Sequence, residues 1–252
     1  MVFSSLKYVL AGWLAGLSMV QVVWAQSDVL AARTRVYEAY VTHNQPAWEA
    51  GISQLQQLYA QRQEPAVLYE LCLAQYGLAA WCAGQKCPDV DKRIQEVQKN
   101  LDKLIQLQPR HAAAHAMMGA AIAMEMGRTP AKAIYLGPRS TYYLDKALSL
   151  DPNNAAAWVE KGNMRYHAPG VFGGDKAEAV KCFQKAVTLF DANASLRQSN
   201  WLYLHALTWL GRSCEAVGDR NQALATYRRI VALEPRFEWV RLELLPQLEM
   251  AR

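Results

Sequence analysis

The sequence predicts an all-α fold of stacked antiparallel helix pairs, and three observations predict it. A helical unit recurs along the chain, with its clearest copy at residues 204–237. Within each copy, small and apolar residues stand three and four positions apart, which is the spacing of one helix face. Signals for strands are few, because β-branched residues are scattered and Asn-Gly hairpin dipeptides are absent.

The clearest copy shows how one pair of helices would pack. Gly211 lies on the inner face of the first helix, and Ala223 and Tyr227 lie on the facing stripe of the second. Small residues at Gly211 and Ala223 would let the two helices approach closely. Pro235 follows the second helix and ends it, because proline cannot continue a helix.

The same pattern continues along the chain after its N-terminal segment, so residues 26–252 are predicted to form one repeat domain. Each helix pair can bury its apolar stripe only against its neighbours, so the array needs a cap at its end. The predicted units are degenerate helix pairs at residues 28–62 and 65–109, clearer repeats at 111–152, 154–191 and 197–237, and a capping helix at 238–252.

These units resemble the tetratricopeptide repeat (TPR), a motif of roughly 34 residues, most closely over residues 111–237. The resemblance implies a right-handed superhelical solenoid. It also implies a role, because members of this family mostly act as non-catalytic scaffolds or adaptors. They hold a peptide or partner protein in a concave groove lined by the first helix of each pair.

Residues 1–25 have the pattern of a secretory signal peptide. Lys7 precedes an uncharged apolar stretch, and polar Gln26 follows the small residue Ala25. We expect cleavage between Ala25 and Gln26 and export, to a bacterial periplasm. An uncleaved membrane anchor is the alternative, because the stretch approaches the length that spans a bilayer. Membrane association is expected only in that case.

Charge and motifs argue against two classes of function. The chain has 27 Lys and Arg against 22 Asp and Glu, but its basic residues never form a run. Nucleic-acid binding would need a clustered basic face, so we do not expect it. The sequence contains no Gly-x-Ser-x-Gly, His-Glu-x-x-His or Cys-x-x-Cys motif. It therefore predicts neither an enzyme nor a bound cofactor, and it leaves the oligomeric state open.

Cys82 and Cys87 are the notable pair among five cysteines, because they lie in a stretch with loop character. A local disulfide between them is predicted in an oxidising compartment, and two free thiols are the alternative. Zinc is disfavoured, because no second cysteine or histidine pair has matching spacing. His111 and His115 are four apart, but only alanines separate them and no further ligand is near in sequence. No metal site is therefore predicted.

The TPR resemblance places a groove on the first helices of the last two repeats, where a protein or peptide of unstated identity would bind. A carboxylate clamp like that of TPR co-chaperones is not expected, because Val159 stands where a lysine would be needed. Carried over residue by residue, the groove positions are Asn163, Tyr166, His167, His205, Thr208, Arg212 and Glu215.

An alternative function is that of a transporter-accessory or small-ligand-binding TPR protein of the periplasm. It rests on a looser resemblance of residues 173–189 to helical-repeat accessory components of transporters that depend on substrate-binding proteins. A closed, ligand-sized pore lined by Tyr166 and Trp209 would favour this alternative, whereas an open groove would favour the scaffold.

Overall fold

The computed structural model describes residues 27–250, and every regular element in that range is helical. The predicted all-α fold is therefore confirmed. The predicted signal peptide at residues 1–25 lies outside the described residues. After a helix at residues 27–41 come α2 (Gln45–Arg62), α3 (Pro65–Gln85), α4 (Val90–Leu107), α5 (Ala112–Arg128), α6 (Ala133–Leu150), α7 (Ala155–His167), α8 (Lys176–Asp191), α9 (Ala194–Arg197), α10 (Trp201–Ala216), α11 (Arg220–Leu233) and α12 (Leu245–Met250).

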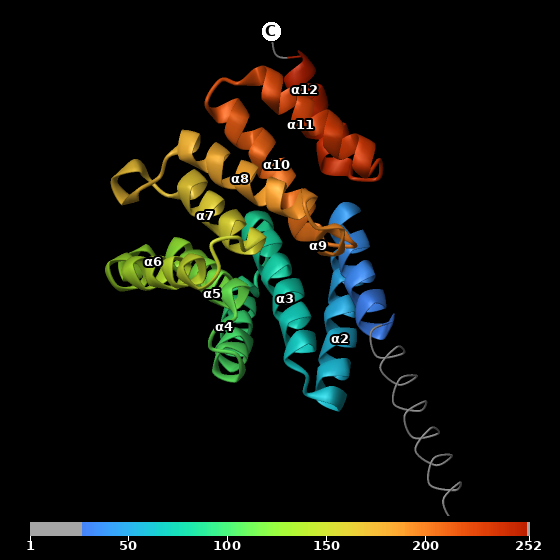
Figure 1. Ribbon diagram of the computed structural model, residues 1–252, viewed down its shortest axis with the longest axis vertical. Helices are drawn as coiled ribbons and strands as arrows, with labels where there is room; N and C mark the ends of the chain where they lie inside the picture. The colour runs from blue at the N-terminus through green and yellow to red at the C-terminus, as the bar shows by residue number, and fades with distance from the viewer. Residues whose placement is uncertain (1–26, 251–252) are drawn as a thin grey trace, which may run out of the picture.

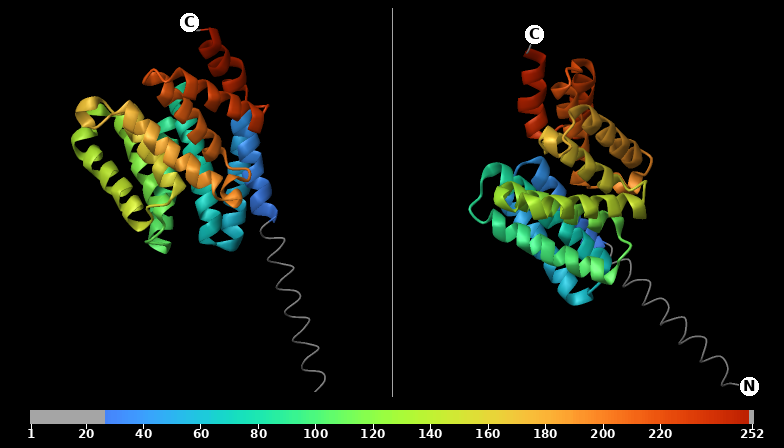
Figure 2. Two further views of the ribbon diagram at one scale, coloured as in Figure 1. Left: turned by 45° about the horizontal axis from the view of Figure 1, so that its top comes forward. Right: turned by 90° about the vertical axis from the view of Figure 1, so that its left-hand side faces the viewer.

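Successive helices pack against each other as hairpins (Figure 1). The tightest pairs are α3 with α4, α5 with α6, α7 with α8, and α10 with α11. Contacts from α4 to α5, from α5 to α7 and from α8 to α10 join each pair to the next. The result is a curved stack of helix pairs, and the two views in Figure 2 show its curvature from other sides.

Polar residues cap the N-termini of several helices in the later pairs. Asn154 begins α7, Asn200 begins α10 and Asp219 begins the second helix α11. Each side chain accepts a hydrogen bond from a backbone N–H of the first turn, which otherwise has no partner within the helix. These caps fix where each repeat starts, and so which residues face inward.

Glycines let the paired helices come close, as the sequence predicts. A Cβ atom added at Gly162 would lie 2.8 Å from the Phe183 ring of α8, and one at Gly211 would lie 2.3 Å from the Tyr227 ring of α11. Real Cβ atoms do not approach other heavy atoms so closely. The aromatic ring of the second helix therefore packs directly on the backbone of the first.

Helix α3 is the most apolar element and lies at the centre of the stack. It is long and apolar enough to cross a membrane, but 67% of its most apolar stretch is buried inside the protein. Its neighbours α2, α4 and α5 cover it. The apolar composition of α3 is therefore explained by its place in the core.

The C-terminal cap is a helix with a wide turn. Residues Trp239–Leu244 (η3) form a π-helical segment that continues into α12, and both pack on α11. Pro246 follows this segment. A proline removes one backbone hydrogen bond and crowds the carbonyl four residues before it, which a wider turn accommodates.

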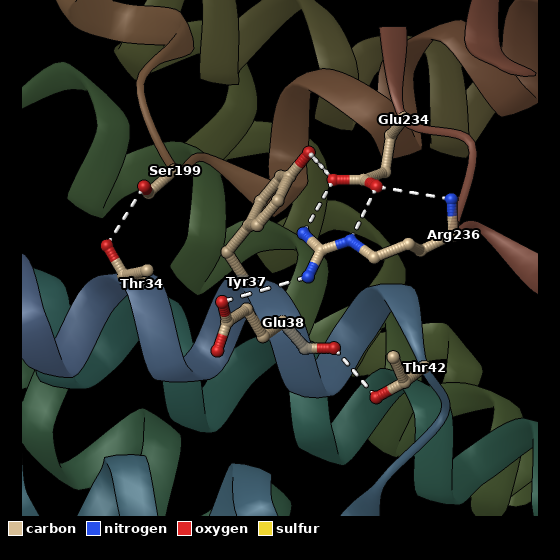
Figure 3. A network of polar contacts seen from close by, with 7 residues as sticks. All are labelled: Thr34, Tyr37, Glu38, Thr42, Ser199, Glu234 and Arg236. Carbon is tan, nitrogen blue, oxygen red and sulfur yellow. Dashed lines mark hydrogen bonds and ion pairs between the residues drawn. The ribbon is translucent and has the colours of Figure 1, made fainter. Parts of the chain in front are cut away.

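The helix at residues 27–41 contacts the last repeat, so the stack closes on itself (Figure 3). Thr34 Oγ1 donates to Ser199 Oγ at 3.0 Å, and Tyr37 donates to Glu234 at 3.1 Å. Arg236 holds the same Glu234 carboxylate through Nε at 2.9 Å and Nη2 at 3.0 Å. These polar contacts join segments that are more than 160 residues apart in sequence.

Aromatic rings fill the inside of this closure. Trp201, at the start of α10, is only 4% exposed and has its ring centroid 5.5 Å from Tyr40, 6.0 Å from Trp48 and 6.3 Å from Tyr76. Tyr40 in turn lies 5.2 Å from Phe237, which follows α11. We call Tyr40, Trp48, Tyr76, Trp201 and Phe237 the closing aromatic core. It occupies part of the inner face, so the groove is not open along its whole length.

Candidate functional site

Helices α7 and α10 carry the groove positions predicted from sequence. Three rings from these helices form an aromatic cluster, defined as Tyr166, His167 and Trp209. The Trp209 centroid lies 4.8 Å from Tyr166 and 4.6 Å from His167, and the rings meet edge to face. Tyr166 and Trp209 are both half-buried, so one side of the cluster packs on the repeat and the other faces solvent.

Two cations flank the aromatic cluster. Lys176 Nζ lies 3.5 Å from the centroid of the Tyr166 ring and also donates to the Tyr166 carbonyl. Arg212 is half-buried and forms no hydrogen bond or ion pair with any residue in the range 27–250. Burial, with these two charges added, lowers the pKa of His167 to about 4, so its ring is neutral at pH 7. The surface is therefore cationic and aromatic at once.

A buried polar chain runs beneath the aromatic cluster and links α3, α7 and α10. Tyr76 donates to Glu160 Oε2 at 2.7 Å, and Asn163 Nδ2 donates to the same oxygen at 2.9 Å. Asn163 Oδ1 lies 3.3 Å from His205 Nε2. Because that oxygen can only accept, the neutral His205 ring must carry its proton on Nε2. Burial lowers the pKa of His205 to about 3.

Glu160 is the member of this chain that the sequence analysis missed. It is 3% exposed, and its Oε1 has no hydrogen-bond partner. Burial raises the pKa of Glu160 to about 7, although the hydrogen bonds from Asn163 and Tyr76 oppose that rise. A signal was present in the sequence, since Glu160 follows an otherwise apolar turn of α7 and stands three residues before Asn163.

Glu160→Gln should change how stability depends on pH. The folded pKa of about 7 lies above the ordinary value of 4.5, so between these values the folded protein binds more protons than the unfolded chain. The contribution of Glu160 to the free energy of unfolding should therefore fall as pH rises through this window, by up to about 3 kcal/mol. Glu160→Gln cannot lose that proton, so the variant should equal the wild type at pH 4 and exceed it at pH 8.

Urea denaturation of both proteins from pH 4 to pH 8 measures this difference. Glu64→Gln, at an exposed position before α3, controls for the loss of one carboxylate. His205 acts in the opposite sense, because its lowered pKa costs stability as pH falls below 6.5, but it is common to both proteins. A constant difference between Glu160→Gln and wild type across the range would contradict a buried, titrating Glu160.

The structure does not leave all seven predicted groove residues free for a partner. Tyr166, His167 and Arg212 are available, whereas Asn163 and His205 are half-buried and engaged in hydrogen bonds of the polar chain. Thr208 is 0% exposed and donates to the Leu204 carbonyl at 2.8 Å, so it does not face the groove. Glu215 accepts a hydrogen bond from Tyr227 of α11.

Thr208 was assigned to the groove face of α10, but the residue on that face is its neighbour Trp209. His205, Trp209 and Arg212 are spaced by four and then three residues, and they form the face that meets α7. Lys176 was missed because it lies at the start of the second helix, α8, and reaches back over the first. The spacing in α10 could have identified Trp209, but nothing in the sequence places Lys176 on Tyr166.

The ring contact between Tyr166 and Trp209 leaves no ligand-sized pore between these two side chains. A cavity of about 10 Å³ lies elsewhere in the described part of the chain, beside Trp201, Arg33 and Glu70. This is room for about one water molecule. The closed pore lined by Tyr166 and Trp209, which would favour a small-ligand function, is therefore not found between these side chains.

The histidine and cysteine pairs considered as metal ligands in the sequence have the following contacts in the structure. His111 caps α5 by accepting from the Ala114 N–H at 3.2 Å, and His115 Nε2 lies 2.9 Å from the Pro109 carbonyl oxygen. Both rings therefore bind local backbone. Cys82 and Cys87 are free thiols here, and the disulfide between them stays a prediction.

Comparison with known proteins adds the fold family. No family model and no curated protein matches the sequence. Among solved structures, a thermophilic TPR protein of Thermus thermophilus superposes with a TM-score of 0.59 at 15% identity, over 81% of this chain and 92% of that one. The HusA haemophore of Porphyromonas gingivalis gives a TM-score of 0.60 at 17% identity, over 72% of this chain and 90% of that one.

Identities this low establish the fold alone. The helix pairs, the glycines that bring their helices together and the two structural likenesses agree on it. The chain has the helical-repeat fold of tetratricopeptide-repeat proteins.

Proposed function

We propose that the protein is a non-catalytic scaffold or adaptor of the cell envelope that holds a segment of a partner protein against α7 and α10. The observation that carries the proposal is Arg212, a half-buried residue one helical turn after Trp209 whose charge acts on His167 and which no described residue pairs. The TPR fold supports it too, because proteins of this fold typically bind protein partners along their first helices.

The chemistry of this surface suits an acidic side chain next to an apolar one. A guanidinium binds a carboxylate through two parallel hydrogen bonds, and Arg and Trp are the residues most often found at the energetic centre of protein interfaces. The aromatic cluster would cover the apolar neighbour. Because His167 is neutral at pH 7, the charge offered to a partner comes from Arg212 and Lys176.

Photocrosslinking tests this assignment. A benzoylphenylalanine at position 167 should crosslink a specific protein in intact cells, whereas one at Asp145, exposed on α6, should not. Arg212→Ala should lower the yield at position 167 at least tenfold, because it removes the carboxylate contact. Arg228→Ala, which removes an exposed arginine of α11, is the matched control and should leave the yield unchanged. Equal yields at positions 167 and 145, or no effect of Arg212→Ala, would refute the site.

The envelope location rests on the sequence of residues 1–25. The mass of the protein isolated from cells tests it, because cleavage after Ala25 leaves a chain that starts at Gln26. An uncleaved chain in the cytoplasmic fraction would contradict the location but leave the binding surface unaffected.

A small-ligand or transporter-accessory role is the alternative proposal, with less support. The likeness to a haemophore concerns the fold, and the rings of Tyr166 and Trp209 are in contact. A ligand would have to separate them, which would change Trp209 fluorescence. Titration with candidate apolar ligands, with Trp209→Phe to identify the signal, distinguishes this role from the scaffold.

A further inference from the structure

The turn between α3 and α4 brings together three side chains that the proposed function does not use. Lys86 takes a left-handed backbone conformation (φ 59°) and ends α3, and the Cys87 N–H donates to the Cys82 carbonyl at 3.0 Å. This folds Cys87 back over the last turn of the helix. Asp89 follows two residues later, at the start of α4. The two sulfur atoms and a carboxylate oxygen of Asp89 all lie within 4.8 Å of one another.

Asp89 is the informative member of this group. It precedes α4 as a capping residue would, yet its side chain makes no capping hydrogen bond. One oxygen, Oδ2, accepts from Arg93 at 2.7 Å, and Arg93 also contacts Glu49 of α2 at 2.6 Å. The guanidinium thus holds the Asp89 carboxylate in place near the thiols. A disulfide between Cys82 and Cys87 would not require a carboxylate, whereas a bound cation would use it.

We propose that Cys82, Cys87 and Asp89 bind a thiophilic divalent cation of the zinc class at the turn between α3 and α4. Zinc binds cysteine sulfur at about 2.3 Å and carboxylate oxygen at about 2.0–2.2 Å, which sets tetrahedral ligand atoms roughly 3.5–3.8 Å apart. The three groups need to move inward only slightly to reach those separations. Cys82 is buried while the Asp89 side chain is 43% exposed, so the fourth position faces solvent.

Charge and protons balance at such a site. Binding displaces one proton from each thiol, so two protons are released for each cation bound. Two thiolates and one carboxylate then carry three negative charges; the divalent cation neutralises two of them, and Arg93 pairs with both Asp89 and Glu49. Sequence spacing alone disfavoured zinc because it offers no second cysteine or histidine pair. The third ligand is instead a carboxylate supplied by the start of the following helix.

Binding of Zn²⁺ and Co²⁺ to the reduced full-length protein tests the proposal. Calorimetry should give one Zn²⁺ per chain, and Co²⁺ should show tetrahedral d–d bands with thiolate charge transfer. Asp89→Asn should weaken Zn²⁺ binding at least tenfold, and Cys87→Ser should weaken it further and reduce the thiolate band. Circular dichroism of each variant checks that the helices remain folded.

Two controls separate ligation from packing. Arg93→Gln removes the ion pair but keeps the Asp89 carboxylate as a ligand, so it should weaken Zn²⁺ binding less than Asp89→Asn does. Cys214→Ser removes a buried thiol from α10 and should have no effect. The proposal is overturned if the reduced wild type binds no metal, if Asp89→Asn or Cys87→Ser binds as the wild type does, or if the pair is found only as a disulfide and reduction yields no binding.

Discussion

Trp201→Ala is expected to lower the free energy of unfolding by about 4 kcal/mol, because removing a buried tryptophan costs roughly 3–5 kcal/mol. Trp201 is 4% exposed and contacts rings from the helix at residues 27–41, from α2 and from α3. An added Cβ atom at Gly77 of α3 would lie 2.6 Å from the Trp201 ring, so the backbone of α3 also packs on it. The cavity left by alanine would therefore loosen the closure of the whole stack.

Urea denaturation followed by circular dichroism measures the effect of Trp201→Ala. Trp201→Phe is the matched control, because it keeps an aromatic ring in the closing aromatic core and should cost clearly less. A second readout is specific to closure: limited proteolysis should cut near residues 42–44 faster in Trp201→Ala. If Trp201→Ala unfolds within 1 kcal/mol of wild type, the ring does not join the two ends of the array.

Gly211→Leu is expected to destabilise the last repeat by roughly 3 kcal/mol or more, beyond the usual cost of overpacking. A Cβ atom alone would lie 2.3 Å from Tyr227 Cε1, before any further side-chain atom is added. The Tyr227 ring is 0% exposed and cannot move aside without leaving the core. Helices α10 and α11 would separate, and the contacts of Glu234 with Tyr37 would be lost with them.

Gly127→Ala is expected to raise the stability of the protein, in contrast to Gly211→Leu. Nothing lies within 4 Å of a Cβ atom at Gly127, near the end of α5. Alanine is a better helix former than glycine by about 0.5–1 kcal/mol, so this variant should be slightly more stable than wild type. Thermal melts of both variants make the comparison. A normal melt for Gly211→Leu would contradict direct packing of Tyr227 on the α10 backbone.

Closure of the array determines where a partner could bind. The closing aromatic core fills the inner face near the start of α10, and the buried chain of Tyr76, Glu160 and Asn163 fills it near the middle of α7. In the part of the chain that the structure describes, the C-terminal halves of α7 and α10 leave the aromatic cluster and Arg212 accessible. The proposed surface is therefore short, and it fits one or two side chains of a partner better than a long peptide.

Helix content and the packing within each pair were predictable from sequence because both depend on residues close in the chain. Spacings of three and four put Gly211 and Tyr227 on the apolar faces of their own helices, and the short link between the two helices brings those faces together. The polar face of α10 was predicted only in part, since Trp209 and Thr208 are adjacent and the choice between them depends on the neighbouring α7. Glu160 and Lys176 were missed because their roles come from contacts with Tyr76 and Tyr166 on other helices.

The sequence by itself therefore determined the helices, their caps and the close approach within each pair, through local spacing and small residues. Only the tertiary structure decided that Thr34 meets Ser199, that Trp201 packs on Tyr40, and that Asp89 lies beside two thiols. For Asp89 the reason is the left-handed turn at Lys86, whereas for the two contacts between the ends of the array it is cumulative geometry. Each pair is rotated slightly against the next, and the sum of these rotations sets whether the ends of the array meet. No single repeat encodes that sum.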